Sequence, residues 1–201
     1  MKALVVYAHP VEGSYSSALR DRAAAALTAR GHEVRVTDLY AEDFQPELSA
    51  WEHAHHLDDP SGKPDIARHV ADLQWCDMLV LVYPTWLSAQ PAMLKGWIDR
   101  IWVSGVVYRL PEGGNRIRPL LTNVRHLVVV TTHGSSKFVN VLQGEPGKRI
   151  VFRSIRLMCR RTVRTHWIAL YRMDRCGDSE RAAFLDRVEK RLSRIKDVRG
   201  R

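Results

Sequence analysis

The chain has 201 residues, is 45% hydrophobic, and carries 31 Lys and Arg against 22 Asp and Glu. This size and composition predict one globular domain over residues 1–201 that needs no disulfide or metal for stability. Apolar runs such as Met78–Val82 and Leu127–Val130 are far shorter than the roughly 20 residues of a membrane-spanning helix. The first apolar run stops at Pro10, too early for a signal peptide. We therefore expect a cytoplasmic protein without a membrane span.

The positive charge is concentrated near the C-terminus. Residues 147–201 hold 17 Lys and Arg against 6 Asp and Glu, whereas residues 1–146 hold 14 against 16. A basic segment of this kind could attract nucleic acid, an acidic membrane or an anionic cofactor. A solvated, arginine-rich helix surface also explains it. Because the sequence contains no recognised nucleic-acid-binding motif, we expect no nucleic-acid partner.

Short apolar segments alternate with helical segments along the chain. Nearly continuous apolar runs indicate buried strands, and segments bounded by glycine or proline indicate helices. In chain order we expect a strand at Ala3–Ala8, a helix at Ser16–Arg30, a strand at Glu33–Leu39, a long connection over 40–64, a helix at Asp65–Trp75, a strand over 77–84, a helix at Pro91–Val103, a strand at His126–Thr132, a helix at Arg149–Arg160, a strand at Thr165–Tyr171 and a helix from Ser179 to Asp197. Parallel neighbours require crossover connections, so this alternation predicts an α/β, doubly wound parallel sheet with helices on both faces.

In such sheets, ligands bind beyond the carboxyl ends of the strands, near the point where strand order reverses. The segment after the first strand, HPVEGSYSSAL, has neither G-x-G-x-x-G nor G-x-x-x-x-G-K-[ST], which counts against a standard dinucleotide-binding turn and a nucleoside triphosphatase. Its Gly13, Ser14, Ser16 and Ser17 lead into a predicted helix, whose free N–H groups suit a phosphate. Simple N-capping by Ser14 or Ser16 explains the serines as well.

Two further segments follow strands at the same edge of the predicted sheet. Residues 84–87 (PTWL) offer backbone amides and an aromatic ring that could hold a flat ring system, and residues 131–134 (TTHG) offer hydroxyls and a glycine beside the same pocket. Alternatively, Trp86, Trp97 and Trp102 are core or dimer-contact residues.

Together these three segments resemble the flavodoxin-fold NAD(P)H:quinone oxidoreductases. HPVEGSYSSAL resembles that family's His-Pro-x-x-x-Ser-[aromatic]-Asn phosphate loop, and TTHGSS resembles its Thr-Thr-x-Gly loop. YPTWLSAQPAMLKGWIDRIW resembles the more specific block Pro-x-x-Trp…Pro-Ala-x-Leu-Lys-Gly-Trp-x-[Asp/Glu]-Arg. The resemblance covers residues 1–145 well and the rest in outline. It implies a flavodoxin-like sheet of five parallel strands, a homodimer, and FAD or FMN as cofactor, with FAD slightly favoured.

The resemblance also implies roles for single residues. It assigns His9, Ser14, Tyr15 and Ser16 to the phosphate and ribityl side of the flavin, and Pro84, Thr85, Trp86, Leu87, Thr131, Thr132, His133 and Gly134 to the isoalloxazine ring. His133 would lie near flavin N1 and O2, where its charge can change near neutral pH; a solvent-exposed loop histidine is the alternative. Ser16 stands where the family usually has Asn, Leu87 replaces a second aromatic residue, and His133 replaces Gly or Tyr. The family's Tyr and His over the nicotinamide or quinone have no clear match.

The implied activity is two-electron, ping-pong hydride transfer from NAD(P)H to a quinone-like acceptor. One alternative is an FMN-dependent reductase of azo or nitro compounds. Another is a regulatory subunit that binds flavin or nucleotide with little turnover. Arg160, Arg161 and the arginines of the last helix could contact the 2′-phosphate of NADPH or the adenylate end of FAD, or form a solvated surface.

The segment WEHAHHLDD gathers five side chains of metal-binding type, namely His53, His55, His56, Asp58 and Asp59. Their types suit a metal ion. However, they lie in a long polar connection without a partner cluster elsewhere, so we expect no metal.

Overall fold

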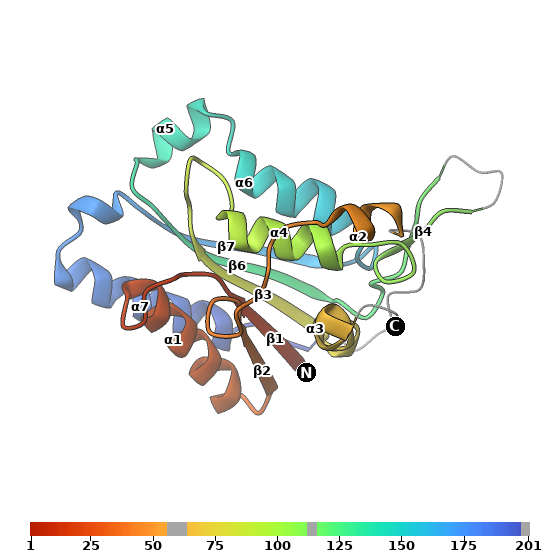
Figure 1. Cartoon of the computed structure of the whole chain (residues 1–201). Coiled ribbons are helices and arrows are strands. Elements are labelled where there is room, and N and C mark those ends of the chain that lie inside the picture. The colour runs from red at the N-terminus through yellow and green to blue at the C-terminus, as the bar shows by residue number, and fades with distance from the viewer. Residues whose placement is uncertain (56–63, 112–115, 198–201) are drawn as a thin grey trace.

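The computed structural model describes residues 1–55, 64–111 and 116–197. The main sheet consists of the parallel strands β1 (Lys2–Tyr7), β2 (Glu33–Asp38), β3 (Met78–Pro84), β6 (His126–His133) and β7 (Arg164–Tyr171). Their order is β2-β1-β3-β6-β7 (Figure 1). This is the flavodoxin-like order, in which strand order reverses between β1 and β3. The predicted five-stranded, doubly wound sheet is therefore confirmed.

The sheet is buried on both faces because helices cover each side. The covering helices are α1 (Tyr15–Ala29) and α7 (Asp178–Ser193) on one face, and α3 (Pro64–Trp75), α4 (Ala92–Ile101), α6 (Pro146–Arg149) and the π-helical η2 (Ile150–Ile155) on the other. Alternate residues of the strands supply the two cores, as the pleat of a strand requires. Gly31, with a φ of 73°, ends α1 as the sequence predicts.

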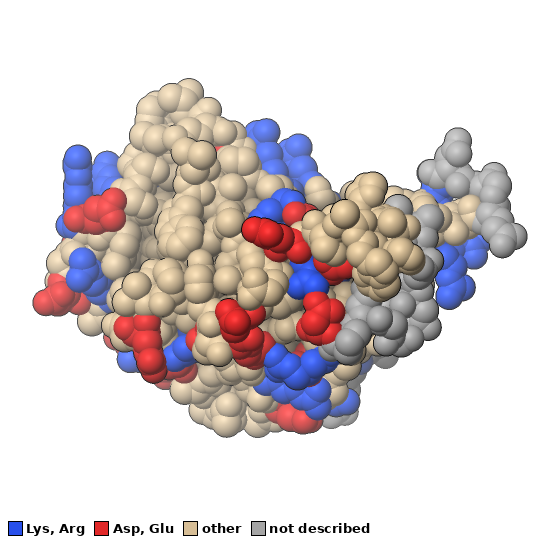
Figure 2. Space-filling model, viewed as in Figure 1, with Lys and Arg blue, Asp and Glu red and all other residues tan. Residues whose placement is uncertain are grey.

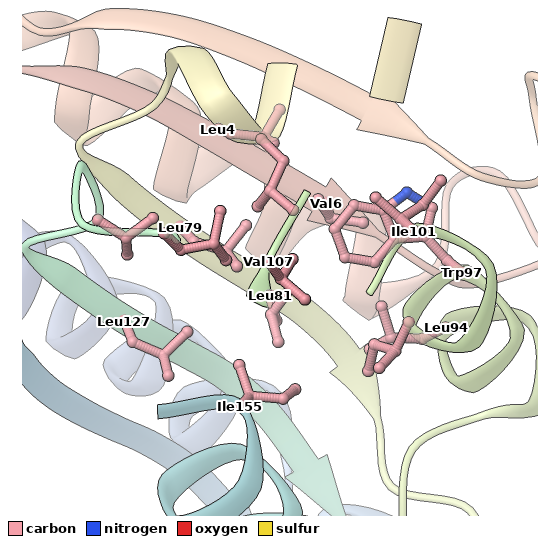
Figure 3. Packing of buried hydrophobic residues seen from close by; sticks show 14 of the residues in the cluster. Leu4, Val6, Leu79, Leu81, Leu94, Trp97, Ile101, Val107, Leu127 and Ile155 are labelled. Atoms are coloured by element: carbon pink, nitrogen blue, oxygen red, sulfur yellow. The ribbon is translucent and has the colours of Figure 1, made fainter. Parts of the chain in front are cut away.

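The larger core joins the sheet to α4 and η2. Figure 3 shows side chains of β1, β3 and β6 packing against Leu94 and Trp97 of α4 and Ile155 of η2. Trp97 is 1% exposed, and its ring makes an edge contact with that of Trp102 at 5.7 Å. Trp97 is therefore a core residue and, contrary to one of the two expectations, cannot supply contact area to a dimer.

Several short elements were not predicted. These are α2 (Ala50–Ala54), the hairpin strands β4 (Tyr108–Arg109) and β5 (Arg118–Pro119), α5 (Lys137–Leu142) and the 3₁₀ turn η3 (Met173–Arg175). They are too short to produce a hydrophobic period in the sequence. The helix expected at Arg149–Arg160 begins earlier, at Pro146, and its regular part ends before Cys159.

Among the described residues, no helix has the length and apolar character required to cross a bilayer.

Candidate functional site

The N-terminus of α1 points toward the carboxyl end of β1. Ser14 is its N-cap: the Ser14 Oγ accepts a hydrogen bond from the Ser17 N–H at 3.2 Å, and the Ser17 hydroxyl donates to the Ser14 carbonyl at 2.6 Å. The capping role that the sequence left as an alternative is therefore present. The N–H groups of Tyr15 and Ser16, at the first two positions of the helix, have no acceptor within it. Capping and an anion site thus coexist here, because they use different N–H groups.

His9 and Trp86 come from different strand ends and lie near each other. Their ring centroids are 6.3 Å apart. Nδ1 of His9 lies 3.1 Å from the Val11 nitrogen and 3.2 Å from the Val11 carbonyl oxygen, so the ring is held against its own loop.

The ends of β3 and β6 are joined beyond the last paired residues of the sheet. The Thr85 N–H donates to the Thr132 carbonyl at 2.8 Å, and the hydroxyls of Thr85 and Thr131 are 3.1 Å apart. These contacts fix the direction in which the chain leaves β3. They also use the Thr85 N–H, which is therefore not free to bind a ligand.

A tight turn, Trp86–Ala89, follows at once. The N–H groups of Trp86 and Ala89 each donate to the other's carbonyl at 3.1 Å. The two central residues, Leu87 and Ser88, have φ values of 45° and 64°, the left-handed region that residues other than glycine rarely adopt. Leu87 is fully exposed, so packing of its side chain does not compensate for this conformation.

The turn is held in place from the segment that begins α6. The Ser88 hydroxyl donates to Oε1 of Gln143 at 2.6 Å, and the Gly147 N–H donates to the Ser88 carbonyl at 3.2 Å. Gln90 Nε2 donates to the Gly147 carbonyl at 2.8 Å. Contacts with residues 143–147 therefore support a turn whose own residues are in an unfavourable conformation.

These segments enclose a cavity of about 420 Å³, within the usual range of ligand sites. It is lined by His9, Ser14, Tyr15, Ser16, Pro84, Thr85, Trp86, Thr132, Gly134, Met173 and Asp174. The α1 end of the cavity has free N–H groups, and the β3 end has an indole ring. Met173 and Asp174 belong to η3 and were not predicted, because the resemblance fades after residue 145.

The remaining predicted residues, Leu87, Thr131 and His133, are not among those that line this cavity. The His133 ring is 6% exposed and stacks on Tyr171 at 4.7 Å, with 16° between the rings. Burial lowers the pKa of His133, which favours the neutral ring at pH 7. Neither ring nitrogen has a hydrogen-bond partner among the described residues. The expectation of a solvent-exposed histidine does not hold, and a role near the flavin stays a prediction.

A second cavity, of about 240 Å³, also involves His9. It is lined by Tyr7, His9, Pro10, Val11, Glu12, Arg20, Asp38, Tyr40 and Ala41. The Arg20 guanidinium lies over the Tyr7 ring at 4.8 Å and donates to Oδ2 of Asp38 at 2.9 Å. This cavity therefore combines aromatic rings with the Arg20–Asp38 ion pair.

The structure tests only part of the predicted histidine and aspartate cluster. His56, Asp58 and Asp59 lie outside the described residues. His53 and His55 belong to α2 and its C-cap. The described part of the chain contains no group of three or more His, Cys, Asp or Glu side chains that could hold a metal ion.

Comparisons with known proteins agree with the observed fold. A family model for the flavodoxin-like fold matches residues 1–193. The chain is 32% identical over 155 residues to ribosyldihydronicotinamide dehydrogenase-like protein traD of Penicillium crustosum, covering 67% of this chain and 58% of that protein. It is 31% identical over 156 residues to NAD(P)H dehydrogenase [quinone] 1 of Cavia porcellus, covering 70% of this chain and 56% of that protein. The matches thus span little more than half the length of these relatives.

A solved structure covers the chain more fully. The NAD(P)H:quinone oxidoreductase from Methanothermobacter marburgensis is 28% identical, with a TM-score of 0.79, and the match covers 98% of this chain and 99% of that one. The structural similarity therefore includes the C-terminal segment, which the sequence motifs of the family do not cover.

Proposed function

Because the chain belongs to the family with the flavodoxin-like fold, we propose that it is a flavin-dependent NAD(P)H oxidoreductase that reduces quinone-like acceptors. The observation that carries the proposal is the difference between the two ends of the 420 Å³ cavity. One end has the open N-terminus of α1, and the other has the Trp86 ring. A flavin nucleotide has two matching ends, with a phosphate at one and a flat ring at the other. The names of the relatives point to the same activity.

The residues at the α1 end fit a phosphate. The N–H groups of Tyr15 and Ser16 are free donors at the first positions of α1, and the His9 ring lines the same cavity. The positive end of the α1 dipole adds to their attraction for an anion. We propose that these three groups bind the flavin phosphate.

The residues at the β3 end fit a flat ring. Trp86 is 44% exposed, so its ring offers a surface for stacking. The Thr85–Thr132 bond and the Trp86–Ala89 turn fix the backbone that carries this ring. A bound flavin would supply the hydride chemistry between the nicotinamide and the acceptor, as cofactors of this kind do. The protein's part is to position the ring and to leave one side of it accessible for the two substrates in turn.

We propose FAD as the cofactor, with FMN as the alternative. The contacts at the α1 end concern the phosphate that both molecules contain. The second cavity shares His9 with the first and could take a further nucleotide portion, which favours FAD.

We also propose a homodimer. The β4–β5 hairpin projects from the main sheet (Figure 1), and a two-stranded hairpin on its own is only marginally stable in water. It exposes Leu110 and Ile117, and α5 exposes Phe138 (75%) and Leu142 (78%). A second copy of the chain that covers these side chains would remove this apolar area from water.

The test is an absorption spectrum of the purified protein, followed by anaerobic addition of NADH or NADPH and by chromatography of the compound released on heating. We expect a flavin spectrum that bleaches on reduction, and chromatography decides between FAD and FMN. An acceptor series then separates quinone reduction from azo reduction. A protein that takes up neither flavin would contradict the proposal.

A matched pair of variants tests the site itself. Trp86→Ala should weaken flavin binding by on the order of tenfold, the usual effect of losing one aromatic contact. Trp51→Ala is the control, because Trp51 is similarly exposed (54%) but stacks on His55 in α2. Equal flavin affinities of the two variants would show that Trp86 does not contact the flavin.

A further inference from the structure

The helical segment from α6 through η2 turns a row of arginines outward. Its buried residues recur at every fourth position, at Gly147, Val151, Ile155 and Cys159. The positions midway between them face away from the core, which places Arg149, Arg153 and Leu157 on the outer surface. Arg156 is exposed beside them. The spacing of the apolar residues therefore determines that this helix presents a basic side to the outside.

The basic side has no acidic counterpart in the same stretch of chain. Between Glu145 and Asp174 the sequence contains eight Lys and Arg and no Asp or Glu. Lys148 pairs with Glu145 at 2.9 Å. The arginine stripe, defined here as Arg149, Arg153, Arg156, Arg160 and Arg161, makes no ion pair within the parts of the chain that the structure describes. Figure 2 shows basic side chains gathered over α6 along the upper margin of the molecule.

Within the helical part of the stripe, Arg149, Arg153 and Arg156 follow one another at three or four residues, and unpaired like charges at this spacing repel one another. An anionic partner would remove this repulsion, whereas a second copy of the chain would not. A two-fold interface at this place would set the stripe against itself, because the same patch meets on both subunits.

We propose that the arginine stripe binds the surface of an acidic phospholipid membrane. Leu157, within the stripe, is 65% exposed, and a helix side that combines arginines with an exposed leucine suits the interface between headgroups and acyl chains. Nucleic acid fits less well, because bases stack on exposed aromatic rings. The rings next to the stripe, Phe152 and Trp167, are partly buried and contact each other at 5.8 Å.

The stripe begins next to the candidate site. Gly147 of α6 donates its N–H to Ser88 of the turn that carries Trp86, and Arg149 follows two residues later. Membrane binding would therefore place the cavity close to the bilayer, where apolar acceptors dissolve. Binding to lipid does not depend on the proposed activity, and it can be measured with no flavin or acceptor present.

The experiment is co-sedimentation of the full chain with vesicles of phosphatidylcholine and phosphatidylglycerol in equal parts, with vesicles of phosphatidylcholine alone for comparison. We expect binding to the acidic vesicles only, and we expect added salt to weaken it, because salt screens the attraction. The variant R153Q/R156Q/R161Q should lower the partition coefficient by roughly a hundredfold, given the contribution of each arginine at such a surface.

The matched control is R30Q/K190Q/R194Q. It removes the same charge from exposed residues of the opposite, α1–α7 side of the sheet. Binding that is lost in the stripe variant and kept in the control supports the proposal. Equal loss in both variants, or no binding to acidic vesicles, overturns it. So does stripe-dependent binding of a single-stranded oligonucleotide by a protein that does not bind the vesicles.

Discussion

The Asp174 carboxylate occupies the space that a Cβ atom at Gly134 would need. Both residues line the candidate cavity, one at the end of β6 and the other in η3, after β7. A side chain at position 134 would therefore have to displace a carboxylate that comes from far along the sequence.

This contact predicts the effect of Gly134→Ala. The methyl group should displace the exposed Asp174 side chain rather than backbone, so we expect a stability loss below about 1 kcal/mol. Flavin affinity should fall by on the order of tenfold as the displaced carboxylate moves within the cavity. Fluorescence titration with flavin measures this. The double variant G134A/D174A should regain most of the affinity; a double variant as weak as G134A would rule out the contact as the cause.

Leu87 should be replaceable by glycine with a gain in stability. Its φ of 45° is unfavourable for leucine, and its side chain is fully exposed. Leu87→Gly should raise the free energy of unfolding by about 0.5 kcal/mol, because relief of the left-handed conformation outweighs the added freedom of the unfolded chain. Urea denaturation is the measurement. Ser88→Gly is the comparison. It relieves the same left-handed conformation but loses the hydrogen bond to Gln143, so it should not raise the free energy of unfolding. A destabilised Leu87→Gly would mean that the side chain has contacts in solution.

Gly96 of α4 should not accept even alanine. A Cβ there would overlap the backbone of Pro46, which cannot move aside as a flexible side chain can. We expect Gly96→Ala to lower the free energy of unfolding by about 1–3 kcal/mol. Gly177→Ala, where nothing lies within 4 Å of the added atom, should cost below about 1 kcal/mol. Equal losses in the free energy of unfolding for the two variants would show that the loop at Pro46 moves to make room for the added methyl group.

Arg100 joins three separate segments from within the protein. It is 6% exposed, donates from Nε to Oε1 of Glu52 at 2.8 Å and to the Gln45 carbonyl at 2.6 Å, and also pairs with Asp65. Arg100→Met should cost about 3–5 kcal/mol, because Glu52 would be left buried without its partner. The double variant R100M/E52M should cost less than R100M alone. Denaturant unfolding of both variants measures the difference, and additive losses would contradict this account of the pair.

Stability should decrease in mild acid because of two buried histidines. Burial lowers the pKa of His69 and of His126 to about 4, below the value of about 6.5 in the unfolded chain. Between these values the unfolded state binds more protons than the folded state, so the free energy of unfolding falls as pH falls. Each histidine contributes a slope of about 1.4 kcal/mol per pH unit, and the full contribution is present above pH 6.5.

Urea unfolding between pH 7.5 and pH 4.5 measures this slope. The variant H69Q should flatten it, and H69Q/H126Q should flatten it further. An unchanged slope in the double variant would assign the acid sensitivity to other groups.

The sequence by itself determined the framework of the protein. The apolar runs of β1, β3 and β6 form the buried strands, and the polar segments after them meet at one edge, because parallel strands end on the same side of a sheet. His9, Trp86 and Gly134, far apart in the chain, could therefore be expected in one cavity. The motifs that identify the family lie in these same segments.

The tertiary structure alone decided the contacts between residues with no shared pattern. Asp174 lies against Gly134, Pro46 lies against Gly96, and the His133 ring stacks on Tyr171. Short elements such as α5 and the β4–β5 hairpin likewise produce no period in the sequence. The physical reason is the range of the interactions: hydrophobic periodicity and turn chemistry act over a few residues, whereas close packing joins side chains whose neighbours are known only once the chain has folded.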